Sequence, residues 1–140
     1  MDTVLSLDHF SKIYSNGRGA RSITFSVERG QVVGLLGPNG SGKTTIMKSL
    51  TGLAQPTEGT VTLFGVNAAD RERALQNVGA LIEQPALYEN LTALDHLCMA
   101  ARYYPQVDRA RIDKVLRIVG LLPYAKERCG KFSLGMKQRM

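Results

Sequence analysis

Alternation of apolar and polar positions marks several of the strands that the sequence predicts. Residues 3–10 and 23–27 place apolar side chains two apart, as a half-buried strand does. Residues 32–36 are instead continuously apolar and are bounded by turn-forming residues, which is typical of a parallel strand buried on both faces. Further strands are expected at residues 60–64 and 78–82. The core is therefore expected to be a sheet.

Helical spacing predicts the remaining elements. A short helix is expected at residues 70–75, and an amphipathic helix at residues 108–119. Thr92 and Asp95 form a capping-box pattern, which predicts that another helix begins there. Ser133 can cap a final short helix.

The cysteines and histidines give no sign of a metal site. Cys98 falls on the apolar face of the helix that follows Thr92, so a buried, reduced thiol is expected. Cys129 is far from Cys98 in the sequence, and no CxxC or Cys/His pattern occurs. His9 is placed in a strand and His96 on the polar side of its helix, and we expect surface or structural roles for both.

Composition and charge narrow the class of protein. The 140 residues are 44% hydrophobic and 21% charged, as in a globular domain. The net charge of +6 is scattered rather than gathered in a stripe, which disfavours nucleic acid as a partner. No apolar run approaches the ~18 residues that span a bilayer, and the first residues lack a signal-peptide pattern. A cytoplasmic protein is expected, with any membrane association made through a partner.

A glycine-rich loop carries the clearest chemistry. Its residues fit G-x-x-x-x-G-K-[ST] at every position, between a predicted buried strand and a predicted helix. The glycines let backbone N–H groups turn toward phosphates, and the helix start adds its positive end. Lys43 supplies a charge for the β- and γ-phosphates, and Thr44 a hydroxyl for Mg²⁺. The predicted nucleotide-binding set is Gly37, Pro38, Asn39, Gly40, Ser41, Gly42, Lys43, Thr44 and Thr45.

The loop alone indicates nucleotide phosphate binding, which kinases, GTPases and transport ATPases share. The plain alternative is a glycine-rich turn with an unrelated lysine. The segments 31–46 and 53–65 resemble ATP-binding cassette (ABC) proteins, and the resemblance covers essentially the whole chain. Segments 82–92 and 133–139 are most similar to ATP-binding subunits of the bacitracin and lantibiotic export type.

This resemblance implies a fold and a division of the chain. The expected fold is an α/β P-loop NTPase of ABC type: a parallel core sheet with an antiparallel β subdomain and a helical subdomain. Residues 1–85 would form the nucleotide-binding core and β subdomain, residues 86–133 the helical subdomain, and residues 133–140 a signature segment. The implied cofactors are ATP and Mg²⁺.

Two further site assignments follow from the resemblance. Tyr14 stands where the family places an aromatic ring that stacks on adenine; an ordinary tyrosine at a strand end is the alternative. The family's glutamine loop, which reaches Mg²⁺ and the attacking water, departs here from its usual pattern. Glu83 occupies the expected glutamine position and Gln84 follows it. We expect Glu83 to reach the metal and count both as catalytic candidates, with Lys43.

Residues 132–139 resemble the ABC signature, usually LSGGQ. Ser133 and Gly135 match, whereas Leu134 and Met136 replace a glycine and the glutamine. A capping serine and a glycine at a helix start offer a hydroxyl and open N–H groups to an anion. The resemblance implies that this anion is the γ-phosphate held by a second ATP-binding subunit, in a head-to-tail dimer. Read alone, the segment is a capped helix start.

In the family, the Walker B aspartate, the catalytic glutamate and a switch histidine follow the signature, so the chain is expected to be truncated before the Walker B strand. Three interpretations remain: the ATPase subunit of an exporter, a module that binds ATP without hydrolysing it (or a gene remnant), and another P-loop enzyme. Tyr14 and the signature-like segment disfavour the third. The resemblance also implies a membrane-spanning permease partner and a place on the inner face of the cell membrane.

Overall fold

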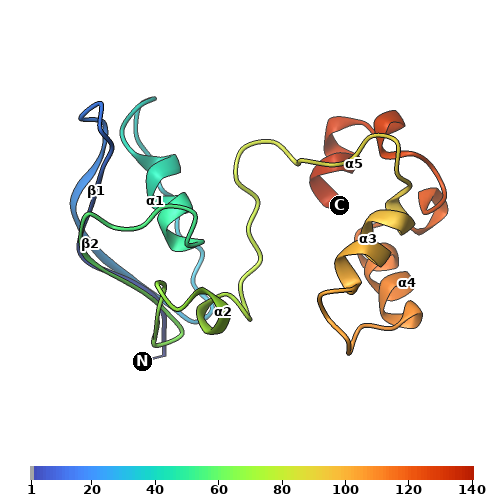
Figure 1. The fold of residues 1–140 in the computed structure, drawn as a ribbon, viewed down its shortest axis with the longest axis horizontal. Helices are drawn as coiled ribbons and strands as arrows, with labels where there is room; N and C mark the ends of the chain where they lie inside the picture. The colour runs from blue at the N-terminus through green and yellow to red at the C-terminus, as the bar shows by residue number, and fades with distance from the viewer. Residues whose placement is uncertain (1) are drawn as a thin grey trace. The chain divides into compact units, whose positions relative to one another are not determined.

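An antiparallel sheet forms the first of two units in the computed structural model, which describes residues 2–140. This unit ends at Ile82, and Glu83–Met140 form the second. The sheet contains β1 (Thr3–Ile13) and β2 (Gly19–Glu28), both labelled in Figure 1, together with β3 (Glu58–Leu63) and β4 (Val66–Asn67). The strand order is β2-β1-β3-β4. All the pairings in this sheet are antiparallel. The predicted strands at residues 3–10, 23–27 and 60–64 are therefore present, and the first two are longer than expected.

Apolar side chains from the sheet and one helix form the core of this unit. The helix α1 (Lys43–Leu50) buries Ile46 and Leu50 on the side that packs with the strands. Phe10 and Leu7 of β1 are almost completely buried in the same cluster. Burying apolar surface contributes about 25 cal/mol per Å², so this cluster holds α1 on the sheet.

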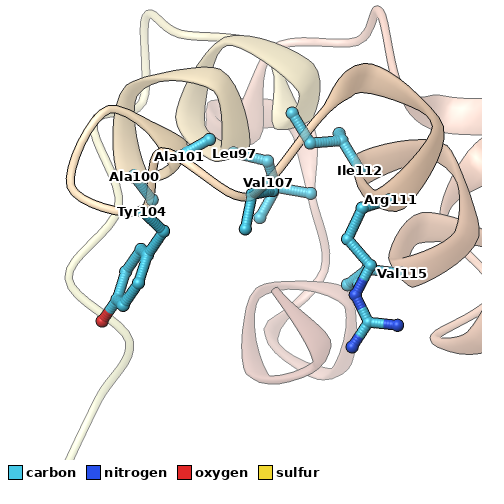
Figure 2. A pocket seen from close by; sticks show the side chains of 8 residues that line it. All are labelled: Leu97, Ala100, Ala101, Tyr104, Val107, Arg111, Ile112 and Val115. Atoms are coloured by element: carbon cyan, nitrogen blue, oxygen red, sulfur yellow. The ribbon is translucent and has the colours of Figure 1, made fainter. Parts of the chain in front are cut away.

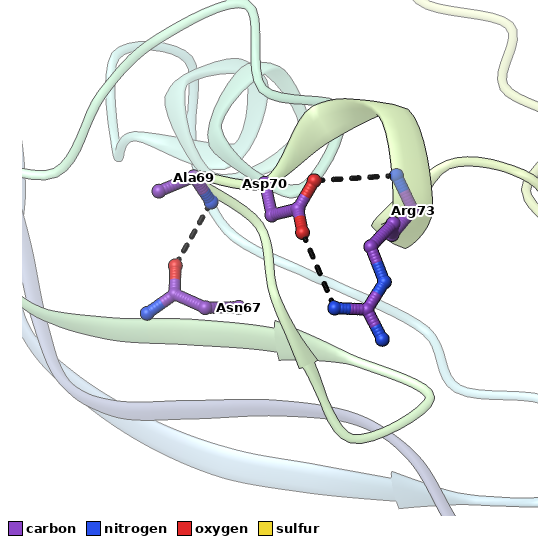
Figure 3. A network of polar contacts seen from close by, with 4 residues as sticks. All are labelled: Asn67, Ala69, Asp70 and Arg73. Atoms are coloured by element: carbon purple, nitrogen blue, oxygen red, sulfur yellow. Dashed lines mark hydrogen bonds and ion pairs between the residues drawn. The ribbon is translucent and has the colours of Figure 1, made fainter.

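A short helix, α2 (Arg71–Ala74), follows the last strand. Asn67 accepts a hydrogen bond from the N–H of Ala69 (2.8 Å), and Asp70 accepts one from the N–H of Arg73 (3.4 Å) (Figure 3). A carboxylate oxygen of Asp70 also lies 3.7 Å from a guanidinium nitrogen of Arg73. Asp70 is thus the N-cap of α2, which lies within the helix predicted over residues 70–75.

Two predicted strands are not strands in this structure. Residues 32–36 and 78–82 have no regular secondary structure, and Val32 and Leu36 are almost fully exposed. A strand that is buried on both faces needs hydrogen-bonded neighbours on both edges. Within residues 2–140, the strand pairings involve only β1 to β4. The predictions of a buried parallel strand at 32–36 and of a further strand at 78–82 were both wrong for this structure, because no paired strand flanks either segment.

The second unit is helical. It contains α3 (Ala93–Ala101), α4 (Arg109–Ile118), two 3-10 turns, η1 (Leu122–Tyr124) and η2 (Cys129–Lys131), and α5 (Leu134–Arg139). Thr92 and Asp95 make both bonds of the predicted capping box. Its core contains, among others, Leu116, Leu121, Cys129 and Phe132. A hollow of about 130 Å³ between α3 and α4 is lined mainly by apolar side chains, with Arg111 as its charged member (Figure 2).

The buried face of α3 differs from the predicted one. Cys98 is exposed, and His96 is buried at 7% exposure. The His96 ring stacks on Tyr88 with centroids 5.7 Å apart, and its Nε2 lies 3.1 Å from the Tyr88 carbonyl oxygen. This stacked, hydrogen-bonded contact makes burial of the imidazole favourable and turns Cys98 toward solvent. The expected burial of Cys98 and the expected polar position of His96 were both wrong.

No helix within residues 2–140 has both the length and the apolar character needed to cross a bilayer.

Candidate nucleotide-binding site

The glycine-rich loop leads directly into the N-terminus of α1. Gly40 and Gly42 have φ values of 86° and 95°, in the left-handed region that favours glycine. Gly42 is the N-cap residue, and no side chain caps this helix in the part of the chain that the structure describes. A Cβ on Gly37 would lie 2.7 Å from the Ser41 hydroxyl oxygen. Glycine is therefore favoured at Gly40 and Gly42, and the first N–H groups of α1 remain open to an anion.

Lys43 is bound to its own loop. Its Nζ donates hydrogen bonds to the carbonyl oxygens of Gly37 (2.7 Å) and Pro38 (2.8 Å). The ammonium group therefore lies over the loop, where a phosphate held by the N–H groups would also lie. Thr44 is exposed, whereas Thr45 is 9% exposed and packs into the unit.

Most of the predicted phosphate-binding residues line one hollow with Tyr14. Its volume is about 350 Å³, a usual size for a small-molecule site. Gly37, Pro38 and Ser41 shape the loop but do not line the hollow. The lining residues are Tyr14, Asn16, Arg18, Gly19, Asn39, Gly40, Gly42, Lys43, Thr44 and Thr45.

Tyr14 directly follows β1 and lines the hollow together with the phosphate loop. Its side chain is 37% exposed, and Lys12 Nζ lies 5.4 Å from the ring centroid, a distance at which a cation is attracted by the ring. A flat aromatic surface that is partly exposed in a hollow can stack on a base. Asn16, Arg18 and Gly19 follow Tyr14 in the chain and also line the hollow, but they were not predicted as site residues from the sequence.

The glutamine-loop candidates begin the second unit. Glu83 has a φ of 65°, which is uncommon for a residue with a side chain. Gln84 lines a hollow of about 260 Å³ within the second unit, together with Phe132, Leu134 and Lys137. These residues come from the two ends of the unit, so its fold brings the glutamine-loop candidate next to the signature-like segment.

The signature-like segment has the local geometry expected of a capped helix. The Ser133 hydroxyl oxygen accepts a hydrogen bond from the N–H of Met136 (3.2 Å), and a Cβ on Gly135 would meet no atom within 4 Å. Lys137 forms an ion pair with Glu89 at 2.9 Å. The hydrogen bond and charge of Lys137 lower the pKa of the Glu89 carboxyl group. This pair ties α5 to the loop that precedes α3.

The donor set decides how a metal ion could be held. Within residues 2–140, no group of three or more His, Cys, Asp or Glu side chains is placed to bind a metal. A hydroxyl such as that of Thr44 suits Mg²⁺ when phosphate oxygens and water complete the coordination, as magnesium prefers. The open N–H groups, the ammonium of Lys43 and this hydroxyl fit a nucleotide that brings Mg²⁺ with it.

Known proteins resemble the chain along its whole length. A model of the ABC transporter family matches residues 20–140. The bacitracin transport ATP-binding protein BcrA of Bacillus licheniformis is 38% identical over all of this chain and 46% of its own length. The SkfA peptide export ATP-binding protein SkfE of Bacillus subtilis (strain 168) is 39% identical over 98% of this chain and 58% of its own length.

Solved structures agree with these relatives. One described as the ATP-binding subunit of an ABC transporter has a TM-score of 0.82 and 34% identity, over 97% of this chain and 58% of that one. A cbiO1 structure from Clostridium perfringens has a TM-score of 0.81 at 21% identity, which supports the fold alone. The chain spans about half the length of the curated relatives that it matches.

Proposed function

This chain belongs to the ABC transporter family, among its ATP-binding subunits, and from that premise we propose that residues 14–45 bind ATP together with Mg²⁺. One observation carries the proposal: the phosphate loop, the N-terminus of α1 and the ring of Tyr14 line the same hollow. The predicted ABC-type α/β fold is confirmed by the solved structures.

Each residue of the site has a part in binding. The N–H groups of residues 40–45 would hold the phosphates at the positive end of α1. Lys43 would exchange the carbonyl oxygens of Gly37 and Pro38 for phosphate oxygens. The Thr44 hydroxyl would ligate Mg²⁺, which neutralises phosphate charge when bound. The Tyr14 ring would stack on the adenine base.

The second unit would contact the metal, the attacking water and the γ-phosphate of a nucleotide. Glu83 or Gln84 would reach the metal and the attacking water. Ser133 and Gly135 would bind the γ-phosphate held by a second subunit, in a head-to-tail dimer. The matching division of the chain is residues 1–85, 86–133 and 133–140, as the sequence suggests. The capped start of α5 and the open surface at Gly135 support this role.

Hydrolysis and transport are proposed for the whole natural protein. The relatives BcrA and SkfE are described as ATP-binding proteins of bacitracin transport and of peptide export. By analogy, the natural protein would power a membrane-spanning permease of the export type from the cytoplasmic face of the membrane. The alternative is a module that binds ATP without turnover.

The first test is a binding measurement on the full natural chain. Replacing Lys43 by alanine should weaken ATP binding by about 100-fold, because a charge-assisted hydrogen bond contributes about 1.5–3 kcal/mol. The matched control is Lys114→Ala, which removes an exposed lysine from α4. Equal affinity in the wild type and Lys43→Ala would refute the site. Measured turnover that depends on Lys43 would then separate the transport ATPase from the binding module.

A further inference from the structure

The loop between β1 and β2 is held in one shape by hydrogen bonds between its ends. The N–H of Tyr14 donates to the carbonyl oxygen of Arg18 (2.8 Å), and the N–H of Gly17 donates to that of Tyr14 (2.9 Å). The Asn16 side chain accepts a hydrogen bond from the N–H of Arg18 (3.0 Å). The backbone of Arg18 is thus fixed relative to the backbone of Tyr14.

This fixed backbone brings Arg18 to the phosphate side of the hollow. Gly19 follows Arg18, and the carbonyl oxygen of Gly19 approaches Gly42 so closely that a Cβ there would lie 2.9 Å from it. Gly42 is the N-cap of α1, where the phosphates are proposed to bind. Arg18 also lines the hollow, and its backbone links Tyr14 to the residue that approaches the N-terminus of α1.

The side chain of Arg18 is available for a ligand. It is exposed, and its guanidinium group makes no hydrogen bond or ion pair with any of residues 2–140. Lys12, a basic residue near the end of β1, already lies over the ring of Tyr14. A guanidinium group carries donors in a planar fork that matches phosphate oxygens, and it stays charged at any physiological pH.

We propose that Arg18 is a further binding residue, which holds the phosphate nearest the nucleoside. This inference rests on the proposed nucleotide site. The base and the helix N-terminus fix the two ends of the ligand. The group that lies between them is the sugar with its α-phosphate, and the phosphate is the only anion there. Arg18 thereby adds a contact that depends on a phosphate attached to a nucleoside.

Competition against a fluorescent trinitrophenyl ATP analogue on the full natural chain tests this role. ATP, ADP, AMP and adenosine are each titrated as competitors. Arg18→Ala should weaken the binding of ATP, ADP and AMP by a similar factor of about ten, and should leave the binding of adenosine unchanged. The affinity of Arg18→Lys for ATP, ADP and AMP should lie between those of the wild type and Arg18→Ala, because lysine keeps the charge but lacks the planar fork of donors. Arg21→Ala removes an exposed arginine of β2 that does not line the hollow, and should change each affinity less than about twofold.

Several results would overturn the inference. Arg18→Ala behaving like Arg21→Ala would show that the guanidinium makes no contact with the nucleotide. An equal loss of affinity for adenosine would place the contact on the base or sugar. A loss of affinity confined to ATP would place the contact at the γ-phosphate. If Lys43→Ala weakens ATP binding as expected while Arg18→Ala does not alter it, only this inference fails. If the wild type binds no ATP, the proposed function fails with it.

Discussion

Gly42 meets two demands at one residue. Its φ of 95° lies in the left-handed region, which costs a residue with a side chain about 1–2 kcal/mol. A Cβ would also lie 2.9 Å from the carbonyl oxygen of Gly19 and 3.0 Å from the Cβ of Ala20. The glycine thus lets the start of α1 and the end of the β1–β2 loop approach, which closes the nucleotide hollow.

Alanine substitutions in the loop should separate these two demands. Gly40→Ala places a side chain at φ 86° with no atom within 4 Å of its Cβ, so only backbone strain is expected, about 1 kcal/mol. Gly42→Ala adds the close contacts and should cost about 2 kcal/mol or more. Gly34→Ala, with no positive φ and open space, is the control and should be close to neutral. Urea unfolding measures all three, and equal losses for Gly40→Ala and Gly42→Ala would refute the contact.

Single residues also show where sequence reasoning has its limit. The phosphate-loop residues were identified from their order alone, because the loop geometry depends on local glycines. The burial of His96 and the exposure of Cys98 could not be predicted, since the buried imidazole depends on its contact with Tyr88, eight residues away. Arg18 was missed for a related reason: its place in the hollow is set by how the β1–β2 loop meets the N-terminus of α1.

Among the elements, those with local signals agree best with the structure. Thr92 and Ser133 each accept a hydrogen bond from a backbone N–H three residues on, as their sequence patterns predict. Asp108 does the same at the start of α4. Residues 32–36 and 78–82 carry an apolar pattern as clear as that of any strand, yet they form none. A helix completes its hydrogen bonds within its own segment, whereas a strand needs partners from elsewhere.

The capping box of α3 predicts a dependence of stability on pH. The hydrogen bonds from the Thr92 side chain and backbone lower the pKa of Asp95 in the folded state. Its stabilising effect is therefore complete above the unfolded pKa of about 3.9 and is lost as the pH falls through the lower folded value. Asp95→Ala should lower the urea midpoint at pH 7, and the gap from the wild type should narrow toward pH 2.

Two further variants test whether this pH dependence comes from the capping box. Thr92→Ala removes the other half of the box and should cost about 1 kcal/mol at pH 7. Glu127→Ala removes an exposed carboxylate outside the box and should leave the midpoint nearly unchanged. A gap for Asp95→Ala that stays constant down to pH 2 would show that the carboxylate is not bonded as described.

For the whole molecule, two separate cores are the central feature. One lies between the sheet and α1, and the other among the helices of the second unit. The ABC-type fold could be predicted from the sequence because the motifs occur in their expected order. The extent of each core could not, since the apolar segment at 32–36 contributes to neither core.

Loss of one core should leave the other folded. Leu116 is fully buried in α4, so Leu116→Ala should destabilise the second unit by about 2–5 kcal/mol. Ile118→Ala, on the same helix at 71% exposure, should cost far less. Amide hydrogen exchange measured per residue should show faster exchange in α3 and α4 and unchanged exchange in β1. An equal acceleration in β1 would show that the cores unfold as one.

The hydrogen bonds between Lys43 and the carbonyl oxygens of Gly37 and Pro38 have a calorimetric consequence. Each nucleotide that binds must first break two bonds from an ammonium group, so the heat released on binding is a difference between bonds made and bonds broken. The enthalpy of binding would then be smaller than the number of phosphate contacts suggests. A nucleotide would bind to this site by exchanging one set of partners for another.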